Sequence, residues 1–221
     1  MKKGLVIFGS GDIAQLAHFY FTTDSEYEVV AFTVDTDYLT VPAFCGLPVV
    51  SFEDVAKHYP PEEYKFFIAL SYTKLNSVRR DKYLTAKTLG YTLVSYVSSR
   101  STILNEAVIG DNCFILEDNT IQPFATIGNN VTLWSGNHIG HHSVIKDHCF
   151  IASHVVVSGG VRIDEQCFIG VNATLRDHIV VGKKTVIGAG ALILSDADSE
   201  GVYIGAATER ARIPSSRLRN I

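Results

Sequence analysis

The stretch NHIGHHSVIKDHCFIASH occupies residues 137–154, and its isoleucines stand six residues apart, at Ile139, Ile145 and Ile151. The same step continues in both directions along the chain. Every sixth residue from 103 to 193 is aliphatic: Ile103, Ile109, Ile115, Ile121, Ile127, Leu133, Ile139, Ile145, Ile151, Val157, Ile163, Ile169, Leu175, Val181, Ile187 and Ile193. A short, fixed period of this kind predicts a parallel β-helix, in which each coil stacks on the coil before it.

Other positions of the six-residue repeat are also restricted. Glycine directly follows the aliphatic residue at 110, 128, 140, 170, 182 and 188, where we expect a turn with an unusual backbone angle. The fourth residue after the aliphatic one is usually small, and three of the four cysteines, Cys113, Cys149 and Cys167, fall there. We therefore expect these thiols to be buried packing groups.

The residues before the repeat follow a different pattern. Strands are expected at 5–8, 27–35, 65–72 and 91–97, with helices after the first strand and over about 74–89. Strands that alternate with helices predict βαβ units and a parallel sheet, here half of a Rossmann-like fold at most. We divide the chain into an α/β domain at 1–98, an all-β helix at 99–198 and a C-terminal tail at 199–221.

Composition excludes several classes of protein. Hydrophobic residues make up 47% and charged residues 19%, which is ordinary for a soluble globular chain. The net charge of −4 argues against nucleic acid or an anionic membrane as the partner. The first apolar run, Leu5–Phe8, is too short for a signal peptide or a membrane span, so we expect a cytoplasmic protein.

A glycine-rich loop joins the first strand to the first helix. Gly9, Ser10, Gly11 and Asp12 begin a G-x-G-x-x-A pattern that ends at Ala14, and Asp35 ends the second strand. Such a loop attracts phosphate to the helix start, and an acidic residue at this place can bind a ribose hydroxyl. A nucleotide sugar, a dinucleotide such as NAD, or a turn that only packs helix on strand would each explain it, and we favour the nucleotide sugar.

These features together resemble the bacterial nucleotide-sugar acyltransferases that N-acetylate bacillosamine and perosamine precursors or O-acetylate sialic acid. The resemblance rests on the hexads, on GSGD (9–12), on FTVDTD (32–37) and on IGAGALI (187–193) with EGVYIG (200–205), and it covers nearly the whole chain. It implies a left-handed β-helix with three hexads in each coil, a homotrimer, and acetyl-CoA as co-substrate, with no metal. The N-terminal domain would bind the nucleotide-linked amino sugar.

The resemblance also assigns roles within the β-helix. IGHHSVIKD (139–147) resembles the family's base-bearing segment, so His141 would be the general base that takes a proton from the attacking amine. With three hexads in a coil, Gly159 would stack on His141, and its amide would stabilise the oxyanion. The coenzyme would lie in a trench lined by Gly159 together with Gly170, Val171, Gly188 and Ala189.

Two departures from the family leave the partner of His141 open. The family commonly has an acidic residue directly after the base, where this chain has His142, and a second histidine where this chain has Phe150. Asn137 and His138 are the candidates to orient the base in place of that acidic residue, and His142, which flanks His141, is a further catalytic candidate.

Three other readings remain. A sugar hydroxyl is the alternative acceptor, a trimeric zinc lyase of the carbonic anhydrase kind is the alternative enzyme, and a nucleotide-sugar-binding scaffold is the non-catalytic alternative. Residues Arg210, Arg212, Arg217 and Arg219 of the tail are candidates to meet the coenzyme's phosphates.

Overall fold

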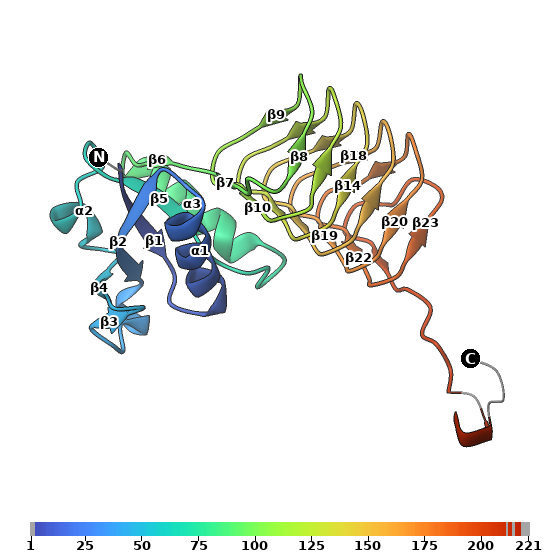
Figure 1. The fold of residues 1–221 in the computed structure, drawn as a ribbon, viewed down its shortest axis with the longest axis horizontal. Helices are drawn as coiled ribbons and strands as arrows, with labels where there is room; N and C mark the ends of the chain where they lie inside the picture. The colour runs from blue at the N-terminus through green and yellow to red at the C-terminus, as the bar shows by residue number, and fades with distance from the viewer. Residues whose placement is uncertain (1–2, 211, 214, 218–221) are drawn as a thin grey trace.

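The computed structural model describes residues 3–210, 212–213 and 215–217, which form a small α/β domain followed by a long stack of coils (Figure 1). The N-terminal sheet has the order β3-β4-β2-β1-β5-β6. Its strands are parallel except for the β3–β4 hairpin. Their bounds are Lys3–Phe8 (β1), Tyr27–Val34 (β2), Ala43–Phe44 (β3), Leu47–Ser51 (β4), Lys65–Ile68 (β5) and Thr92–Leu93 (β6).

Helices cover both faces of this sheet. Helix α1 (Asp12–Thr23) buries Ala14, Ala17 and Phe21 against one face, while α2 (Val55–His58) and α3 (Ser77–Thr88) pack on the other. A short 3-10 helix, η1 (Thr36–Tyr38), follows β2, and a second, η2 (Ser215–Arg217), lies in the tail. The predicted α/β domain is therefore present, and the β3–β4 hairpin and α2 were not predicted.

Two predicted boundaries in this domain differ from the structure. The helix expected from about residue 74 begins at Ser77, because Lys74, Leu75 and Asn76 have φ angles of 50°, 51° and 63°, outside the right-handed helical region. The single strand expected at 91–97 is two strands. Strand β6 pairs with β5 in the N-terminal sheet, whereas β7 (Tyr96–Val97) pairs with β10 in the stack of coils.

The coils form a left-handed parallel β-helix with three flat faces. Face 1 holds β7, β10 (Phe114–Ile115), β13 (Thr132–Leu133), β16 (Phe150–Ile151), β19 (Phe168–Ile169), β22 (Val186–Ile187) and β24 (Val202–Tyr203). Face 2 holds β8 (Thr102–Ile103), β11 (Thr120–Ile121), β14 (His138–Ile139), β17 (Val156–Val157), β20 (Thr174–Leu175) and β23 (Leu192–Ile193). Face 3 holds β9 (Val108–Ile109), β12 (Thr126–Ile127), β15 (Val144–Ile145), β18 (Arg162–Ile163) and β21 (Val180–Val181).

Each two-residue strand ends on the aliphatic residue of its hexad. Within a face, paired residues are eighteen apart, as in His138 with Val156 and Ile139 with Val157. The aliphatic column fills the interior, where Ile139, Ile145 and Ile151 are all fully buried. The six-residue period therefore places one side chain per strand in the core, and three hexads complete a coil, as predicted.

Three corners join the faces, and one residue in each turn adopts a left-handed backbone. We name the corner between faces 2 and 3 corner A, that between faces 3 and 1 corner B, and that between faces 1 and 2 corner C. The left-handed residue comes three places after the aliphatic one, with φ of 54° at Asn130, 58° at His142 and 70° at Gly160. Glycine, asparagine and histidine adopt this region more readily than most residues.

The role predicted for the repeat glycines was therefore wrong. The glycines that follow the aliphatic residue do not have positive φ; they are needed because the next coil lies too close. A Cβ on Gly140 would lie 2.5 Å from the amide nitrogen of Gly159, and one on Gly170 would lie 2.6 Å from that of Ala189. Close stacking of backbones excludes a side chain at these positions.

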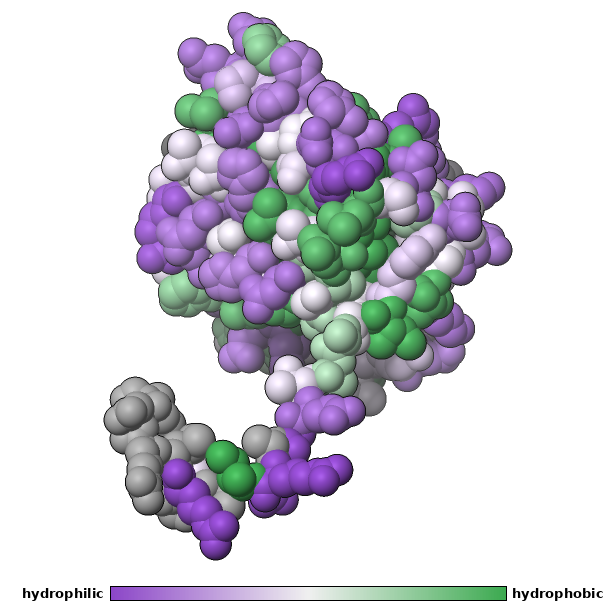
Figure 2. Space-filling view, turned by 90° about the vertical axis from the view of Figure 1, so that its right-hand side faces the viewer, coloured by the Kyte–Doolittle hydropathy of each residue, from purple (hydrophilic) through white to green (hydrophobic). Residues whose placement is uncertain are grey.

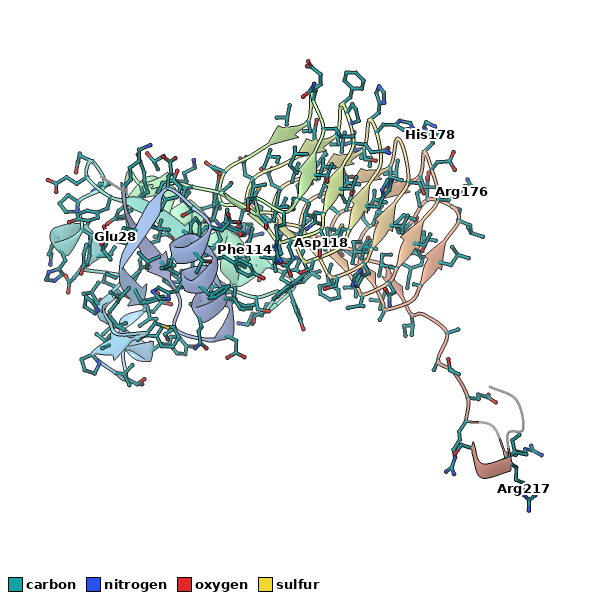
Figure 3. The ribbon with its side chains drawn as sticks, viewed as in Figure 1. Glu28, Phe114, Asp118, Arg176, His178 and Arg217 are labelled. Carbon is teal, nitrogen blue, oxygen red and sulfur yellow. The ribbon has the colours of Figure 1, made fainter. Side chains whose placement is uncertain are left out.

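Helix α3 attaches the N-terminal domain to face 1 and corner B. Arg79 is 2% exposed and donates to the carbonyls of Cys149 (3.0 Å) and His148 (3.4 Å) and to the hydroxyl of Thr132. Its guanidinium also lies 5.7 Å from the centre of the Phe150 ring. Phe114, labelled in Figure 3, packs into the same junction from face 1. The junction is thus a buried core with one cation solvated by backbone oxygens.

The β-helix begins at β7 and includes β24, beyond which the tail extends away from the coils (Figure 1). Arg210, Arg212 and Arg217 lie in this exposed tail, and Arg219 lies outside the described residues.

We predict that Arg79→Ala lowers the free energy of unfolding by about 2–4 kcal/mol, because it opens a cavity at the junction and removes the donor to the His148 carbonyl and the Thr132 hydroxyl. Arg80 is the matched control on the same helix. Its side chain is 33% exposed, pairs with Asp81 and donates to Oε1 of Gln166 (2.7 Å), so Arg80→Ala should cost about 1 kcal/mol. Denaturant unfolding of both variants measures the difference, and equal losses would contradict this account of the junction.

Candidate active site

His141 and Gly159 are in direct contact at corner A. The pairing of coils eighteen residues apart places the two residues one above the other, and the amide of Gly160 donates to the carbonyl of His141 (2.8 Å). A Cβ on Gly159 would lie 2.6 Å from Cε1 and 2.7 Å from Nε2 of the His141 ring. Because residue 159 has no side chain, the imidazole can approach this backbone closely.

The amide of Gly159 has no acceptor among the described residues. In the strands, backbone amides donate to the next coil, but at the corners the amide of the second residue after the aliphatic one, as at Asn129, His141 and Gly159, donates to no backbone carbonyl among the described residues. The corresponding amide of His141 is capped by the Gln122 side chain, whose Oε1 lies 2.9 Å from it. A free donor beside an imidazole nitrogen is the arrangement that stabilises negative charge on an oxygen near a general base.

His142 is in contact with the ring of His141, but Asn137 is not. The Nδ1 atoms of the two histidines lie 3.1 Å apart, at hydrogen-bonding distance. Asn137 is 1% exposed, donates to the Trp134 carbonyl (2.5 Å) and accepts from the Val155 amide (2.8 Å). The prediction that Asn137 orients the base is therefore corrected. Its carboxamide is occupied in corner C, at the other end of face 2.

Three of the other histidines are explained by the backbone of the corners, whereas His138 lies in strand β14. His148, His154 and His178 have φ angles of 64°, 58° and 57°, so they occupy the left-handed position in three different coils. His178 lies on the outer rim of the coils (Figure 3). Because the histidines are spread over three corners, no group of three or more metal-binding side chains gathers within the described part of the chain. A zinc site of the kind considered above would need ligands from a second chain.

His148 is buried at corner B in a ladder of polar side chains. Its Nδ1 lies 2.9 Å from Nδ2 of Asn130, and Oδ1 of Asn130 accepts from Nδ2 of Asn112 (2.8 Å). The Tyr83 ring packs edge-on against His148, with centres 5.5 Å apart. Burial lowers the pKa of His148 to about 4. The neutral ring accepts the hydrogen bond from Asn130, so His148 is a structural residue of the domain junction.

The cysteines are buried away from His141. The thiols of Cys113, Cys149 and Cys167 each lie 3.1 Å from a backbone carbonyl of the next coil, and burial raises the pKa of Cys113 to about 11. The expectation that these thiols are packing groups is confirmed, and each is fully buried in the core.

The residues predicted to line the coenzyme trench lie at corner C. Gly170 is stacked beneath Ala189, the carbonyl of Val171 accepts from the Gly190 amide (2.8 Å), and Gly188 lies under the backbone at Tyr203. Beside them is a groove of about 550 Å³ lined by residues 190–193 and 202–206. Figure 2, viewed from this end, shows hydrophobic side chains gathered here, and Leu192, Val202 and Ile204 are 63%, 66% and 87% exposed.

The glycine-rich loop lines a cavity of about 330 Å³ at the carboxyl ends of β1, β2 and β5. Gly9, Ser10, Gly11 and Asp35 all border it, whereas Asp12 begins α1 and does not. Gly9 has a φ of 125°, and a Cβ there would lie 2.7 Å from the Ala69 carbonyl, so this position requires glycine. Four of the five predicted residues therefore share one cavity.

Lys82 is the residue of this cavity that the sequence did not indicate. It reaches in from α3, forms an ion pair with Asp35 and lies 5.4 Å from the centres of the Phe8 and Phe52 rings. A lysine beside a glycine-rich loop and the start of α1 is suited to an anionic group such as phosphate. Nothing in its local sequence distinguishes it from the other polar residues of a surface helix.

Comparisons with known proteins agree with this fold. The family model of the GMPPB C-terminal domain matches residues 93–197, less than half of the chain. No curated protein matches. The acetyltransferase domain of PglB from Neisseria gonorrhoeae is similar at 22% identity, with a TM-score of 0.80 over 91% of this chain and 96% of that one.

Two further solved structures are similar to the same degree. PerB from Caulobacter crescentus, in complex with CoA and GDP-perosamine, has 23% identity and a TM-score of 0.82, over 91% of this chain and 94% of its own. WeeI from Acinetobacter baumannii has 21% identity and a TM-score of 0.78, over 92% and 97%. At this identity the likeness establishes the fold, so the predicted half-Rossmann domain and left-handed β-helix are confirmed. Within the described residues, no helix is both long and apolar enough to span a membrane.

We predict that His148 makes the protein less stable in acid. Between about pH 6.5 and pH 4 the unfolded chain binds a proton at this residue that the folded chain does not. As the pH is lowered through this range, the free energy of unfolding therefore decreases, by up to about 3 kcal/mol. Denaturant unfolding at pH 7 and pH 4.5 should show a smaller loss in His148→Asn than in the wild type. His154→Asn, at an exposed corner, should behave like the wild type, and equal losses in all three proteins would refute the assignment.

Proposed function

We propose that this chain is an acyl-CoA-dependent acyltransferase that N-acetylates the amino group of a nucleotide-linked amino sugar. The main support for the proposal is the contact between the His141 ring and Gly159, whose amide donates to no acceptor among the described residues. The glycine-lined cavity with Lys82 is suited to bind the nucleotide part of the acceptor substrate. PerB, which shares the fold, holds CoA and GDP-perosamine in its structure.

The proposed reaction is direct acyl transfer. The amine of the sugar attacks the thioester carbon while Nε2 of His141 takes its proton, and the amide of Gly159 donates to the oxygen that becomes negative. When the intermediate collapses, the carbon–sulfur bond breaks, and the coenzyme leaves as a thiol after receiving the proton. An acyl-enzyme is not needed, and the core cysteines are too buried to form one.

The arrangement of the parts supports a trimer with shared sites. The N-terminal domain packs on face 1 through α3, and the His141 corner is the one opposite that face. The trench residues Gly170, Val171, Gly188 and Ala189 lie at corner C, so one chain does not bring base, coenzyme and nucleotide cavity together. A second copy that packs against face 2 or face 3 would supply the missing groups. The cytoplasmic location remains a prediction.

The first test is release of thiol from acetyl-CoA with UDP-, GDP- and dTDP-linked amino sugars as acceptors. We expect release with one of them, and a turnover reduced by roughly 10²–10⁴ in His141→Ala, which is the usual size of a general-base effect. Hydroxyl acceptors such as sialic acids test the O-acetylation alternative. Full activity in His141→Ala would exclude His141 as the base, and binding of nucleotide without any turnover would favour a scaffold.

Gly159→Ala is predicted to lower kcat by about 10²-fold, because the new methyl group would lie under 3 Å from Cε1 and Nε2 and displace the ring. The backbone of Gly159 does not have positive φ, and the ring of His141 is exposed and free to move. The melting temperature should therefore change little. A variant with wild-type kcat would show that the position of the ring against residue 159 is irrelevant to turnover.

A further inference from the structure

The hydrogen bond between His141 and His142 has a defined donor and acceptor once His141 acts as a base. The two Nδ1 atoms are 3.1 Å apart and the rings meet edge to face, with centres 5.3 Å apart and planes at 84°. One of the two nitrogens must donate and the other accept. Nδ1 of His141 is the atom engaged, so its Nε2 remains over Gly159, where the reaction would take place.

Protonation of His141 removes the ambiguity of this hydrogen bond. An imidazolium carries N–H donors on both nitrogens and has no acceptor, so Nδ1 of a protonated His141 donates to a neutral His142. The same direction in the resting state leaves the lone pair of His141 on Nε2, available to the amine. In the reverse direction Nε2 would carry the proton, and His141 would not be a base on the side of Gly159. Of the two directions that the contact with His142 allows, only donation by His141 gives the form that the reaction needs.

Phe124 fixes the ring of His142. It occupies the left-handed position one coil earlier in corner A, with a φ of 64°, and its ring centre lies 4.8 Å from that of His142 at an interplanar angle of 38°. A phenylalanine is unusual in this backbone region, which elsewhere in the corners is often occupied by asparagine, histidine or glycine. Its side chain is 53% exposed, so core packing does not account for it.

No carboxylate takes over this role. Among the described residues, neither ring forms an ion pair with an aspartate or glutamate; Phe124 packs against the ring of His142, and Gly159 lies against the ring of His141. We propose that His142, stacked on Phe124, is the positioning residue of His141 and works as a neutral hydrogen-bond acceptor. This inference rests on the proposed function, because it concerns the base of that reaction.

The hydrogen bond itself can be tested without activity. In protein labelled with ¹⁵N-histidine, long-range proton–nitrogen correlations distinguish the tautomers, and the spectrum of His141→Ala assigns the signals. We expect His141 protonated at Nδ1 when neutral, and a shift toward the Nε2-protonated form in His142→Gly. Glycine suits the left-handed backbone, as Gly160 of the same corner shows, so this variant removes the acceptor without straining the turn.

The matched control is His178→Gly. His178 lies in the same corner, is also exposed, and has a φ of 57° against 58° for His142, but it stacks on Gly160 and not on His141. It should leave the tautomer of His141 unchanged. A wild-type His141 protonated at Nε2, or the same tautomer with and without His142, would overturn the inference.

Kinetics give the second readout. His142→Gly should lower kcat by about 10–100-fold, the usual cost of losing an orienting partner, while KM for both substrates changes by less than about twofold. Phe124→Leu should act in the same direction, and Phe124→Tyr, which keeps the ring, should stay close to the wild type. Wild-type kcat in His142→Gly would overturn the inference. Absence of thiol release from the wild-type protein would instead refute the proposed function, and the tautomer would still decide whether His142 accepts from His141.

Discussion

The structure depends on the stacking of coils eighteen residues apart. Parallel strands only two residues long pair above and below, so that every residue lies directly over the one three hexads earlier. Contact with the coils above and below then restricts which residue type fits at each position. It excludes side chains at Gly140 and Gly170, places thiols against carbonyls in the core, and aligns Asn112, Asn130 and His148 into a hydrogen-bonded ladder.

The candidate site is a local exception to the same rule. Strand amides donate to the neighbouring coil, but one amide in each corner has no backbone acceptor among the described residues and is left to a neighbouring side chain or to solvent. Gln122 caps the amide of His141, whereas the amide of Gly159 remains open beside an imidazole. A donor held by rigid backbone costs no reorganisation when charge develops, which is the physical advantage of building such a site on a β-helix.

The domain junction determines how the two halves work together. Arg79 is a buried cation whose neighbours are carbonyls, a hydroxyl and an aromatic ring, so the attachment of α3 to face 1 is held by directed bonds and packing. The same helix carries Lys82 into the nucleotide cavity. One rigid element thus connects the cavity to the β-helix, on the side of the coils away from His141.

Much of this was readable in the sequence because a repeat exposes its own geometry. The aliphatic column, the three hexads in a coil, the stacking of Gly159 on His141 and the shared cavity of Gly9, Gly11 and Asp35 all follow from spacing, from a familiar loop pattern or from the family resemblance. The left-handed corner also leaves a signal in the sequence, since asparagine, glycine or histidine stands three residues after many of the aliphatic ones.

Only the tertiary structure decided which side chains meet when they lie far apart in the sequence or compete for one partner. The sequence indicated Asn137 and His138 as candidates to orient the base, but the fold commits Asn137 to corner C and brings His142 to the base. Lys82 and Arg79 are unremarkable residues of a surface helix until α3 is placed against the cavity and face 1. The reason is physical: a period along the chain determines contacts within the repeat, whereas contacts between domains depend on packing that no local pattern records.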